Sequence, residues 1–391
     1  MTVAIAPMSS VTLSRLIAGQ ISLHSCMTGM RMATPLLALR EGHSALAVGF
    51  LLSLFALTQV FLALPAGRYV DRHGLRRPVG LCVLSASSGA GLAVVFPVFP
   101  VLCLSALMIG GAAGMAVISL QRHVGRSAQN SAELKRMFSW LSIGPAFSNF
   151  IGPLVAGLVI DLFGFRMAFL VLACMPLMTW LWVRHTAELP AVEGQQGDNQ
   201  RGSWDLLSDP MMRRLILVNW LLSSCWDVHT LVVPLLGHER GFSASAIGAI
   251  LGTFALATTA VRVAIPLLAA HMHEWMVMTM AMLSTGAVFA IYPLMPDALT
   301  MGVCSLLLGL SLGSVQPMIM STLHQITPEG RQGEALGIRL MATSVSSVLM
   351  PVLFGTAGAV MGISLVFWTA GSIVAACARI AWRLRPPAHK P

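Results

Sequence analysis

The strongest constraint on this chain is a series of long apolar runs that recur along its whole length. A helix needs about 20 mostly apolar residues to span the hydrocarbon core of a bilayer. The 391 residues hold twelve such runs, at 13–38, 45–66, 79–97, 100–120, 137–160, 166–184, 213–236, 245–268, 275–294, 299–321, 335–357 and 361–382. Apolar residues make up 56% of the chain and charged residues only 10%, which excludes a water-soluble fold. The sequence therefore predicts an all-α integral membrane protein with twelve transmembrane helices.

The distribution of positive charge predicts the orientation of these helices. Lys and Arg near the ends of membrane spans stay on the cytoplasmic side. One side of the predicted topology collects 18 of the 24 cations, whereas the other holds only Arg40, Arg166 and Arg240. We therefore expect a protein of the inner (plasma) membrane with both termini in the cytoplasm. The net charge of +9 reports this bias rather than nucleic-acid binding.

An internal match indicates that the twelve predicted helices are two copies of six. At an offset of 199 residues, residues of the same type meet without a gap, as in Cys26 with Cys225, Pro35 with Pro234, Phe55 with Phe254, Gly110 with Gly309 and Gly114 with Gly313. After a slip of one residue, the offset of 198 pairs Pro153 with Pro351, Gly157 with Gly355 and Gly164 with Gly362. We expect a six-helix bundle at 1–184, a cytoplasmic linker at 185–212 and a second bundle at 213–391. Two similar halves that face one another can rock about a central site, which favours a carrier.

A charged motif follows the second predicted span, where residues 67–77 read GRYVDRHGLRR. It resembles the G-x-x-x-D-R/K-x-G-R-R/K signature of the major facilitator superfamily through Gly67, Asp71, Arg72, Gly74 and Arg76. Leu75 stands at the position that is usually Arg. The resemblance implies a loop that latches the cytoplasmic side, in which Asp71 accepts hydrogen bonds from a neighbouring helix N-terminus and Arg72 pairs across the half. Alternatively, the arginines only anchor the loop at the membrane surface, which leaves the Gly and Asp spacing unexplained.

A second motif lies in the fifth predicted span. Gly152, Pro153 and Gly157 resemble the G-x-x-x-G-P-x-x-G-G motif of the superfamily's antiporters, with Ser148 and Ala156 in place of two glycines. The resemblance favours export. The same antiporters usually carry an Arg inside the fourth span, and this chain has an apolar residue there. Gly-Pro pairs also occur simply as kinked packing surfaces.

Ionisable residues inside predicted spans are candidates for the transport site, because charge is costly in the bilayer centre. Asp227 is the only acid within a predicted span, and Arg31 corresponds through the repeat to a position three residues from it. We expect an Arg31–Asp227 contact, either as a coupling site that His229 tunes or as a structural ion pair. Arg262 and Arg339 are expected to be gate or packing residues. The polar residues at depths compatible with a cavity are Gln59, Asn149 and Gln316.

These observations lead to a ranked set of functions. The first is a secondary active transporter that exports small apolar or amphipathic compounds in exchange for protons by alternating access. The second is a symporter that imports a small organic anion, because buried arginines outnumber buried acids. An enzyme is not expected, since there is no H-E-x-x-H, G-x-S-x-G or nucleotide-binding loop.

The expected partners are a small-molecule solute, a proton or another coupling ion and the lipid bilayer, for a protein that is a monomer and binds no nucleic acid. No cofactor or metal is expected. The seven cysteines all fall in predicted spans and include no C-x-x-C pair. His271, His273 and Glu274 lie close in one loop, and we interpret them as a solvated polar turn rather than a metal site.

Overall fold

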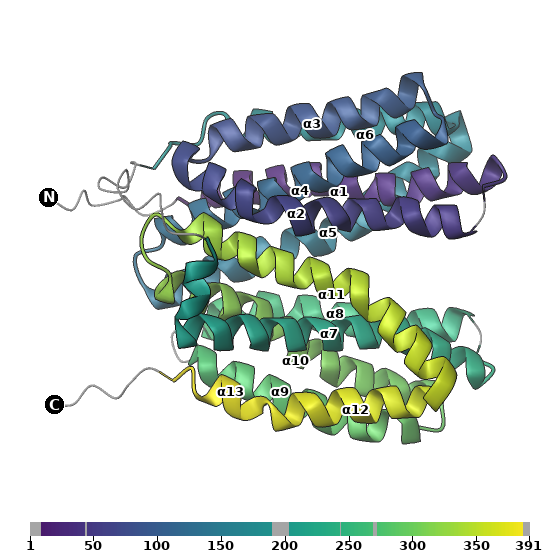
Figure 1. Cartoon of the computed structure of the whole chain (residues 1–391), viewed down its shortest axis with the longest axis vertical. Coiled ribbons are helices and arrows are strands. Elements are labelled where there is room, and N and C mark those ends of the chain that lie inside the picture. Colours follow the sequence, from purple (N-terminus) through teal and green to yellow (C-terminus); the bar gives the residue numbers. More distant parts are fainter. Residues whose placement is uncertain (1–8, 44, 190–202, 243, 269–271, 386–391) are drawn as a thin grey trace, which may run out of the picture. The chain divides into compact units, whose positions relative to one another are not determined.

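A computed structural model describes residues 9–43, 45–189, 203–242, 244–268 and 272–385, and over these residues the chain is helical (Figure 1). The first half forms α1 (Ser10–Arg40), α2 (Ala45–His73), α3 (Arg76–Val95), α4 (Phe99–Ser127), α5 (Ser131–Phe163) and α6 (Phe165–Val183). The second half forms η1 (Ser203–Ser208), α7 (Pro210–Glu239), α8 (Ala244–Leu268), α9 (Glu274–Ile291), η3 (Tyr292–Leu294), α10 (Ala298–Ile326), α11 (Gln332–Met361), α12 (Ile363–Ala376) and α13 (Ala378–Trp382).

Each of the twelve predicted spans corresponds to one long helix, and the last one is broken at Cys377 into α12 and α13. Within the described part of the chain, nine helices are long and apolar enough to cross a membrane. The all-helical membrane fold predicted from the apolar runs is therefore confirmed.

The prediction of a loop at residues 67–77 is wrong. α2 continues to His73, only Gly74 and Leu75 form a turn, and Arg76 already begins α3. Hydropathy marks where a helix leaves the hydrocarbon, but polar residues such as Arg and Asp continue the backbone hydrogen bonding beyond that point. Most of the charged motif therefore lies on a rigid helix end.

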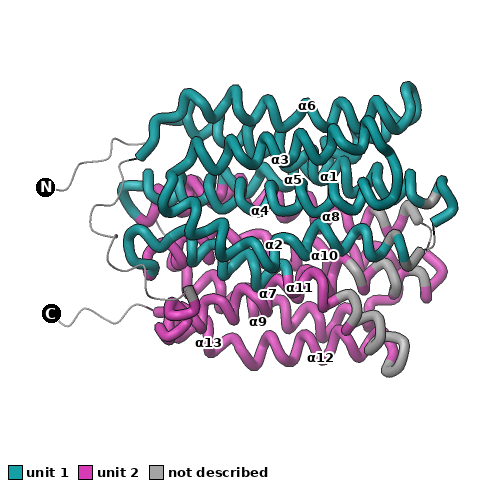
Figure 2. Tube along the Cα trace, turned by 45° about the horizontal axis from the view of Figure 1, so that its top comes forward, with its two compact units in different colours: residues 1–130, 140–203, 327–344 teal, residues 131–139, 204–326, 345–391 magenta. Residues whose placement is uncertain are grey.

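The helices cluster into two compact units (Figure 2). Unit 1 comprises residues 1–130, 140–203 and 327–344, and unit 2 comprises residues 131–139, 204–326 and 345–391. Two helices are thus divided: the first residues of α5 belong to unit 2, and α11 up to residue 344 belongs to unit 1. Residues 190–202 of the predicted linker lie outside the described residues, and η1 occupies part of the remainder.

The repeat appears as matching helix contacts within each unit. In unit 1, α4 packs against α1, α2 and α3, and in unit 2, α10 packs against α7, α8 and α9. A Cβ atom at Gly110 of α4 would collide with the carbonyl oxygen of Phe55 in α2. The equivalent Gly309 of α10 has the same relation to Phe254 in α8. Small residues let helix backbones approach this closely, so the prediction of two six-helix copies is confirmed at the level of individual contacts.

A second repeated feature precedes the sixth helix of each copy. Gly164 before α6 and Gly362 before α12 have φ values of 82° and 88°. L-residues with a side chain rarely adopt this left-handed region, so glycine is required at both turns.

Candidate functional site

The carboxylate of Asp71, near the end of α2, is the centre of a hydrogen-bonded cluster in unit 1. Its Oδ1 accepts from Arg122 Nε at 2.6 Å and from the backbone N–H of Gly333 at 2.9 Å. Its Oδ2 accepts from the backbone N–H of Glu334 at 3.0 Å. The side chains of Asp71 and Arg122 are only 8% and 6% exposed. Asp71 therefore caps the N-terminus of α11 and is neutralised by a buried arginine of α4.

Glycines make this close approach possible. A Cβ atom at Gly67 would collide with the backbone of Gly333, and one at Gly333 would collide with Gly67 and the Asp71 carboxyl group. Glu334 also binds cations, since Arg68 Nε lies 3.5 Å from its Oε1 and Arg331 Nη2 lies 2.9 Å from its Oε2. The first turn of α11 thus rests directly on the last turns of α2.

The turn at Gly74 binds an acid that the sequence did not single out. The backbone N–H groups of Leu75 and Arg76 donate to Glu188 at 3.0 and 2.6 Å. Arg76 Nε donates to the carbonyl of Thr186 at 2.9 Å. Glu188 therefore caps the first turn of α3 and fixes the turn that follows Asp71.

The cation that pairs with Asp71 is Arg122 of α4. The expected pairing of Arg72 across the half stays a prediction. Arg72 is exposed on α2, whereas Arg122 lies within buried residues of α4. Sequence reasoning treated Arg122 only as a cytoplasmic charge. The sequence could indicate that a buried Asp71 needs a cationic partner. The spacing of residues in the motif did not identify the helix that supplies this cation.

Unit 2 contains a cluster at the positions that correspond to the Asp71 cluster in the repeat. Lys135 of α5 is equivalent to Gly333 at the 198-residue offset. Its Nζ lies 3.7 Å from Glu274 Oε1 and donates to the carbonyl of Met272 at 2.5 Å. Ser321 Oγ also donates to Glu274 Oε1, at 2.8 Å. The acid that the sequence placed in a solvated turn is therefore bonded to α5 and α10, and His271 lies outside the described residues.

Asp227 of α7 is hydrogen-bonded within unit 2. Ser346 Oγ of α11 donates to its Oδ2 at 2.9 Å, and Ser224 lies 3.1 Å from the same hydroxyl. The repeat places Thr28 and Ser148 at the equivalent positions of unit 1, where Thr28 Oγ1 donates to the Ser148 carbonyl at 2.7 Å. Asp227 thus replaces an uncharged residue at a contact that both copies share.

Arg31 and His229, which were expected to interact with Asp227, have surroundings that differ from those of Asp227. Arg31 is exposed on α1 of unit 1, and its pairing with Asp227 stays a prediction. His229 is fully buried, and its Nε2 lies 2.9 Å from Ser305 Oγ rather than bonding to Asp227. Residues two apart on a helix point about 200° apart, which explains the separation. Tyr292 donates to or accepts from the same Ser305 hydroxyl at 2.7 Å.

Two of the three arginines inside predicted spans, Arg262 and Arg339, are buried. Arg262 is 6% exposed, and its Nη2 donates to Gln316 Oε1 at 3.1 Å. Its guanidinium also lies 5.9 Å from the centre of the Trp226 ring. Arg339 is 8% exposed. Burial of both side chains agrees with the expected packing role, and a role as gate residues stays a prediction.

The two remaining polar candidates, Gln59 and Asn149, differ in their contacts and exposure. Gln59 of α2 accepts from Ser344 Oγ at 3.2 Å, and its Nε2 lies 3.8 Å from the sulfur of Met27. Asn149 is exposed on α5. Gln59 therefore bridges helices of unit 1.

The Gly-Pro motif of α5 faces α1. A Cβ atom at Gly152 would collide with the Thr28 hydroxyl and approach the Ser25 carbonyl oxygen to 2.5 Å. One at Gly157 would meet only the end of Met32, at 3.4 Å. Pro153 lies within α5. Gly152 is therefore a site of helix contact, whereas Gly157 has room for a side chain.

Comparisons with known proteins agree with this architecture. The family model described as "Major Facilitator Superfamily" matches residues 21–323 and 215–391. The chain is 23% identical over 359 residues to Multidrug resistance protein 1 of Bacillus subtilis (strain 168), covering 88% of this chain and 89% of that protein. A solved bacterial homologue of the iron transporter ferroportin, in an outward-facing state, has a TM-score of 0.78 at 18% identity and covers 95% and 98% of the two chains. The human organic anion transporter MFSD10 (TETRAN) also has a TM-score of 0.78, at 15% identity and 96% and 100% coverage.

Proposed function

Because the chain belongs to the major facilitator superfamily and is a multi-pass membrane transporter of small solutes, we propose that it exports small apolar or amphipathic compounds in exchange for protons. The observation that carries this proposal is Asp227, a carboxylate in the middle of α7 that accepts a hydrogen bond from Ser346. No cation of the described part of unit 2 forms an ion pair with it. Its protonation can therefore change without breaking a salt bridge inside that unit.

In the proposed mechanism, Asp227 alternates between a protonated and an ionised form. Burial favours the neutral carboxylic acid, and a neighbouring cation favours the carboxylate. If Arg31 approaches Asp227 in one state and leaves it in the other, the acid releases and binds a proton once per cycle. Solute binding in the proton-free state then couples export to the proton gradient. The Bacillus multidrug resistance protein supports the direction and the solute class at low identity.

We propose that the Asp71 cluster is the latch of this cycle. Its three donors come from α4 and from the N-terminus of α11, so the cluster forms only when these elements rest on the end of α2. Opening of this side requires those hydrogen bonds to break. The residues Gly67, Asp71, Arg72, Gly74 and Arg76 would then set the free energy of the closed state.

The test uses membrane vesicles with an imposed pH gradient and a lipophilic cationic dye as the transported compound. Asp227→Asn should abolish gradient-driven accumulation while dye exchange without a gradient continues. Asp297→Asn, which changes an exposed acid, should transport like the wild type. Wild-type coupling in Asp227→Asn would eliminate the proton-site proposal.

A charge swap separates coupling from a structural ion pair. If Arg31 and Asp227 only hold helices together, each single variant should lose folded protein, and Arg31→Asp with Asp227→Arg should restore both folding and transport. If Asp227 is the proton site, the swapped variant should fold and fail to couple. Protein levels are matched by immunoblot before transport is compared.

The alternative function is import of a small organic anion. The observation that favours it is the burial of Arg262 and Arg339. Uptake of a radiolabelled dicarboxylate that is lost in Arg262→Gln, together with dye transport that is absent in the wild type, would favour this function over export.

We further propose that the protein resides in the plasma membrane as a monomer with both termini in the cytoplasm, and that residues 185–212 link the halves 1–184 and 213–391. We also propose that it uses no cofactor and binds no nucleic acid.

A further inference from the structure

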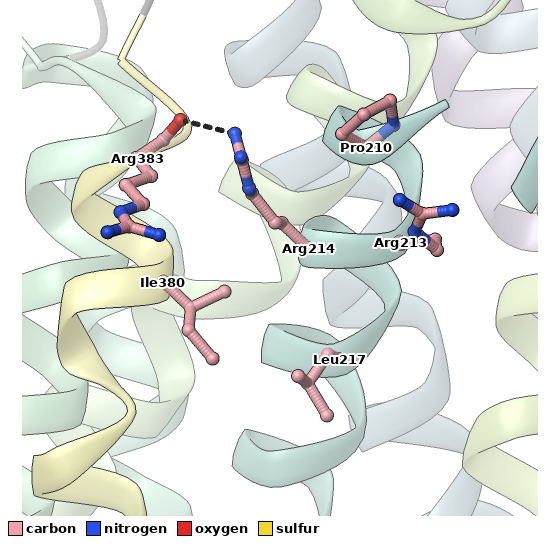
Figure 3. Close-up of a pocket in the computed structure, with 6 residues that line it drawn as sticks. All are labelled: Pro210, Arg213, Arg214, Leu217, Ile380 and Arg383. Atoms are coloured by element: carbon pink, nitrogen blue, oxygen red, sulfur yellow. Dashed lines mark hydrogen bonds between the residues drawn. The ribbon is translucent and has the colours of Figure 1, made fainter. Parts of the chain in front are cut away.

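A basic pocket lies in unit 2, where the first turns of α7 meet α13. Its volume is about 340 Å³. Figure 3 shows the residues that line it, which are Pro210, Arg213, Arg214, Leu217, Ile380 and Arg383. Half of these residues are arginines, and they come from two elements that are far apart in the sequence.

The arginines of this pocket are not neutralised by acids. Arg214 Nη1 donates to the Arg383 carbonyl at 3.5 Å, and Arg213 Nη1 donates to the Leu207 carbonyl at 3.3 Å. Across the described residues, none of the three forms an ion pair. The adjacent Asp209 caps α7 instead, because its Oδ1 accepts from the backbone N–H of Met211 at 2.9 Å. The pocket therefore carries uncompensated positive charge.

The other wall of the pocket is formed by the apolar side chains of Leu217 and Ile380. Leu217 is 40% exposed and follows Arg213 and Arg214 by about one helical turn. Ile380 lies on α13, and Arg383 is the C-cap residue of that helix. A ligand that fits both walls has an anionic head beside the guanidinium groups and an apolar chain along Leu217 and Ile380.

Tryptophans place the pocket at the depth of lipid headgroups. Trp382, next to Arg383, is 48% exposed, and its ring packs against Trp275 with centroids 4.7 Å apart. Arg385 lies 5.6 Å from the Trp275 ring. Tryptophan concentrates at the interface between hydrocarbon and water, and basic pockets between membrane helices on the cytoplasmic side bind anionic headgroups.

We propose that this pocket binds the phosphate headgroup of an anionic membrane phospholipid, with Arg214 and Arg383 as the principal ligands and Arg213 as a third cation. If the three arginines only set the orientation of the protein in the membrane, they would need neither a cavity nor an adjoining apolar wall. A soluble phosphate would use the arginines but leave the Leu217 and Ile380 wall unused. The acyl chain is therefore what distinguishes a lipid from free phosphate.

The experiment measures binding of phosphatidylglycerol to the purified full-length protein in detergent by native mass spectrometry. Phosphatidylcholine and sodium phosphate at matched concentrations are the comparison ligands. The wild type should bind phosphatidylglycerol and neither of the others. The double variant R214Q/R383Q should bind it at least about tenfold more weakly, because two charge-assisted hydrogen bonds are lost.

Two further variants control for surface charge and for misfolding. R136Q/R184Q removes two exposed arginines elsewhere and should keep affinity within about twofold. R214K/R383K keeps both charges and should lose less affinity than R214Q/R383Q. Equal binding of phosphatidylcholine, displacement of the lipid by sodium phosphate, an equal loss in R136Q/R184Q or no lipid binding by the wild type would each overturn the proposal.

Discussion

Ser305 joins two aromatic side chains of unit 2 in a polar contact that the first copy of the repeat lacks. Its hydroxyl lies 2.9 Å from His229 Nε2 and 2.7 Å from the Tyr292 hydroxyl. The His229 ring also stacks on Phe254, with centroids 4.1 Å apart. At the 199-residue offset, the equivalents of His229, Tyr292 and Ser305 are Met30, Ala93 and Ala106. The second unit thus has a specific polar core where the first is apolar.

Removal of the shared hydroxyl should therefore matter more than removal of one of its partners. Ser305→Ala leaves two buried polar groups unpaired and should destabilise the protein by about 1 to 3 kcal/mol for each. Tyr292→Phe leaves the Ser305–His229 bond intact and should cost about 1 kcal/mol. Thermal unfolding midpoints in detergent should fall in the order wild type, Tyr292→Phe, Ser305→Ala. The reverse order of the two variants would exclude a bridging role for Ser305.

Arg122 should contribute more to the stability of unit 1 than Arg72, the exposed arginine that follows Asp71 in the sequence. Arg122 neutralises a carboxylate that is 8% exposed, so Arg122→Gln leaves a buried charge with backbone donors alone. Breaking a buried pair by removing one partner typically costs about 3 to 5 kcal/mol. Arg72 is exposed, so Arg72→Gln should change the unfolding midpoint little. Equal effects of the two substitutions on that midpoint would indicate that both arginines stabilise the Asp71 carboxylate.

At the residue scale, the sequence predicted which side chains accept hydrogen bonds better than it predicted which residues donate to them. The motif implied that Asp71 accepts from a helix N-terminus, and Gly333 and Glu334 are its backbone donors. Neither Arg122 nor Ser346 was predicted as a partner of an acid, because such pairs join helices that are distant in the sequence. The rotation of each helix about its own axis decides which side chains meet. A predicted span with uncertain ends does not define that rotation.

At the scale of helices, the two glycines of the α5 motif should respond in opposite ways to the same substitution. Alanine in a helix interior gains about 1 kcal/mol of helix propensity over glycine. At Gly157 the added methyl group meets only the end of Met32, so Gly157→Ala should be neutral or stabilising. At Gly152 it collides with Thr28, and overpacking typically costs about 1 to 3 kcal/mol. Unfolding midpoints of the two variants, measured in parallel, give the comparison, and equal shifts would contradict the α1–α5 contact.

The helices themselves were predictable because the bilayer requires each span to be long, apolar and internally hydrogen-bonded. Their ends were less predictable, as α2 shows by continuing through Asp71 to His73. The division of α5 and α11 between the two units was not predicted. That division depends on side-chain contacts at helix ends, such as Lys135 with Glu274, which carry no periodic signal.

At the scale of the whole molecule, duplication explains why so much of the fold could be predicted. A repeat that preserves Gly110 with Gly309 preserves the backbone contact that each glycine makes, so one half constrains the other. The candidate site was less predictable because the proposed proton site lies at a position where the copies differ. Thr28 and Asp227 occupy equivalent positions, and of these two side chains only the carboxyl group of Asp227 is titratable.

The proposed orientation of the molecule in the membrane rests on its charge asymmetry, and it can be tested with single cysteines. Glu41 and Asp297 are exposed at helix ends on the side that is poor in arginine, and Ser208 and Pro328 are exposed on the side that is rich in it. Because Lys and Arg near span ends resist translocation, we expect a membrane-impermeant maleimide to label Glu41→Cys and Asp297→Cys in intact cells. Ser208→Cys, Pro328→Cys and a cysteine at position 196 should react only after the cells are opened.

The wild type is the control for this experiment, because six of its seven cysteines lie within helices and Cys377 lies at the junction of α12 and α13. Its labelling sets the background in both conditions. Labelling of position 196 in intact cells would place the linker outside and reverse the proposed orientation. The basic pocket and the Asp71 cluster would then face the exterior. The pocket could not bind lipids of the inner leaflet, and the Asp71 cluster could not latch the cytoplasmic side. The labelling pattern therefore tests at once the orientation on which both proposals depend.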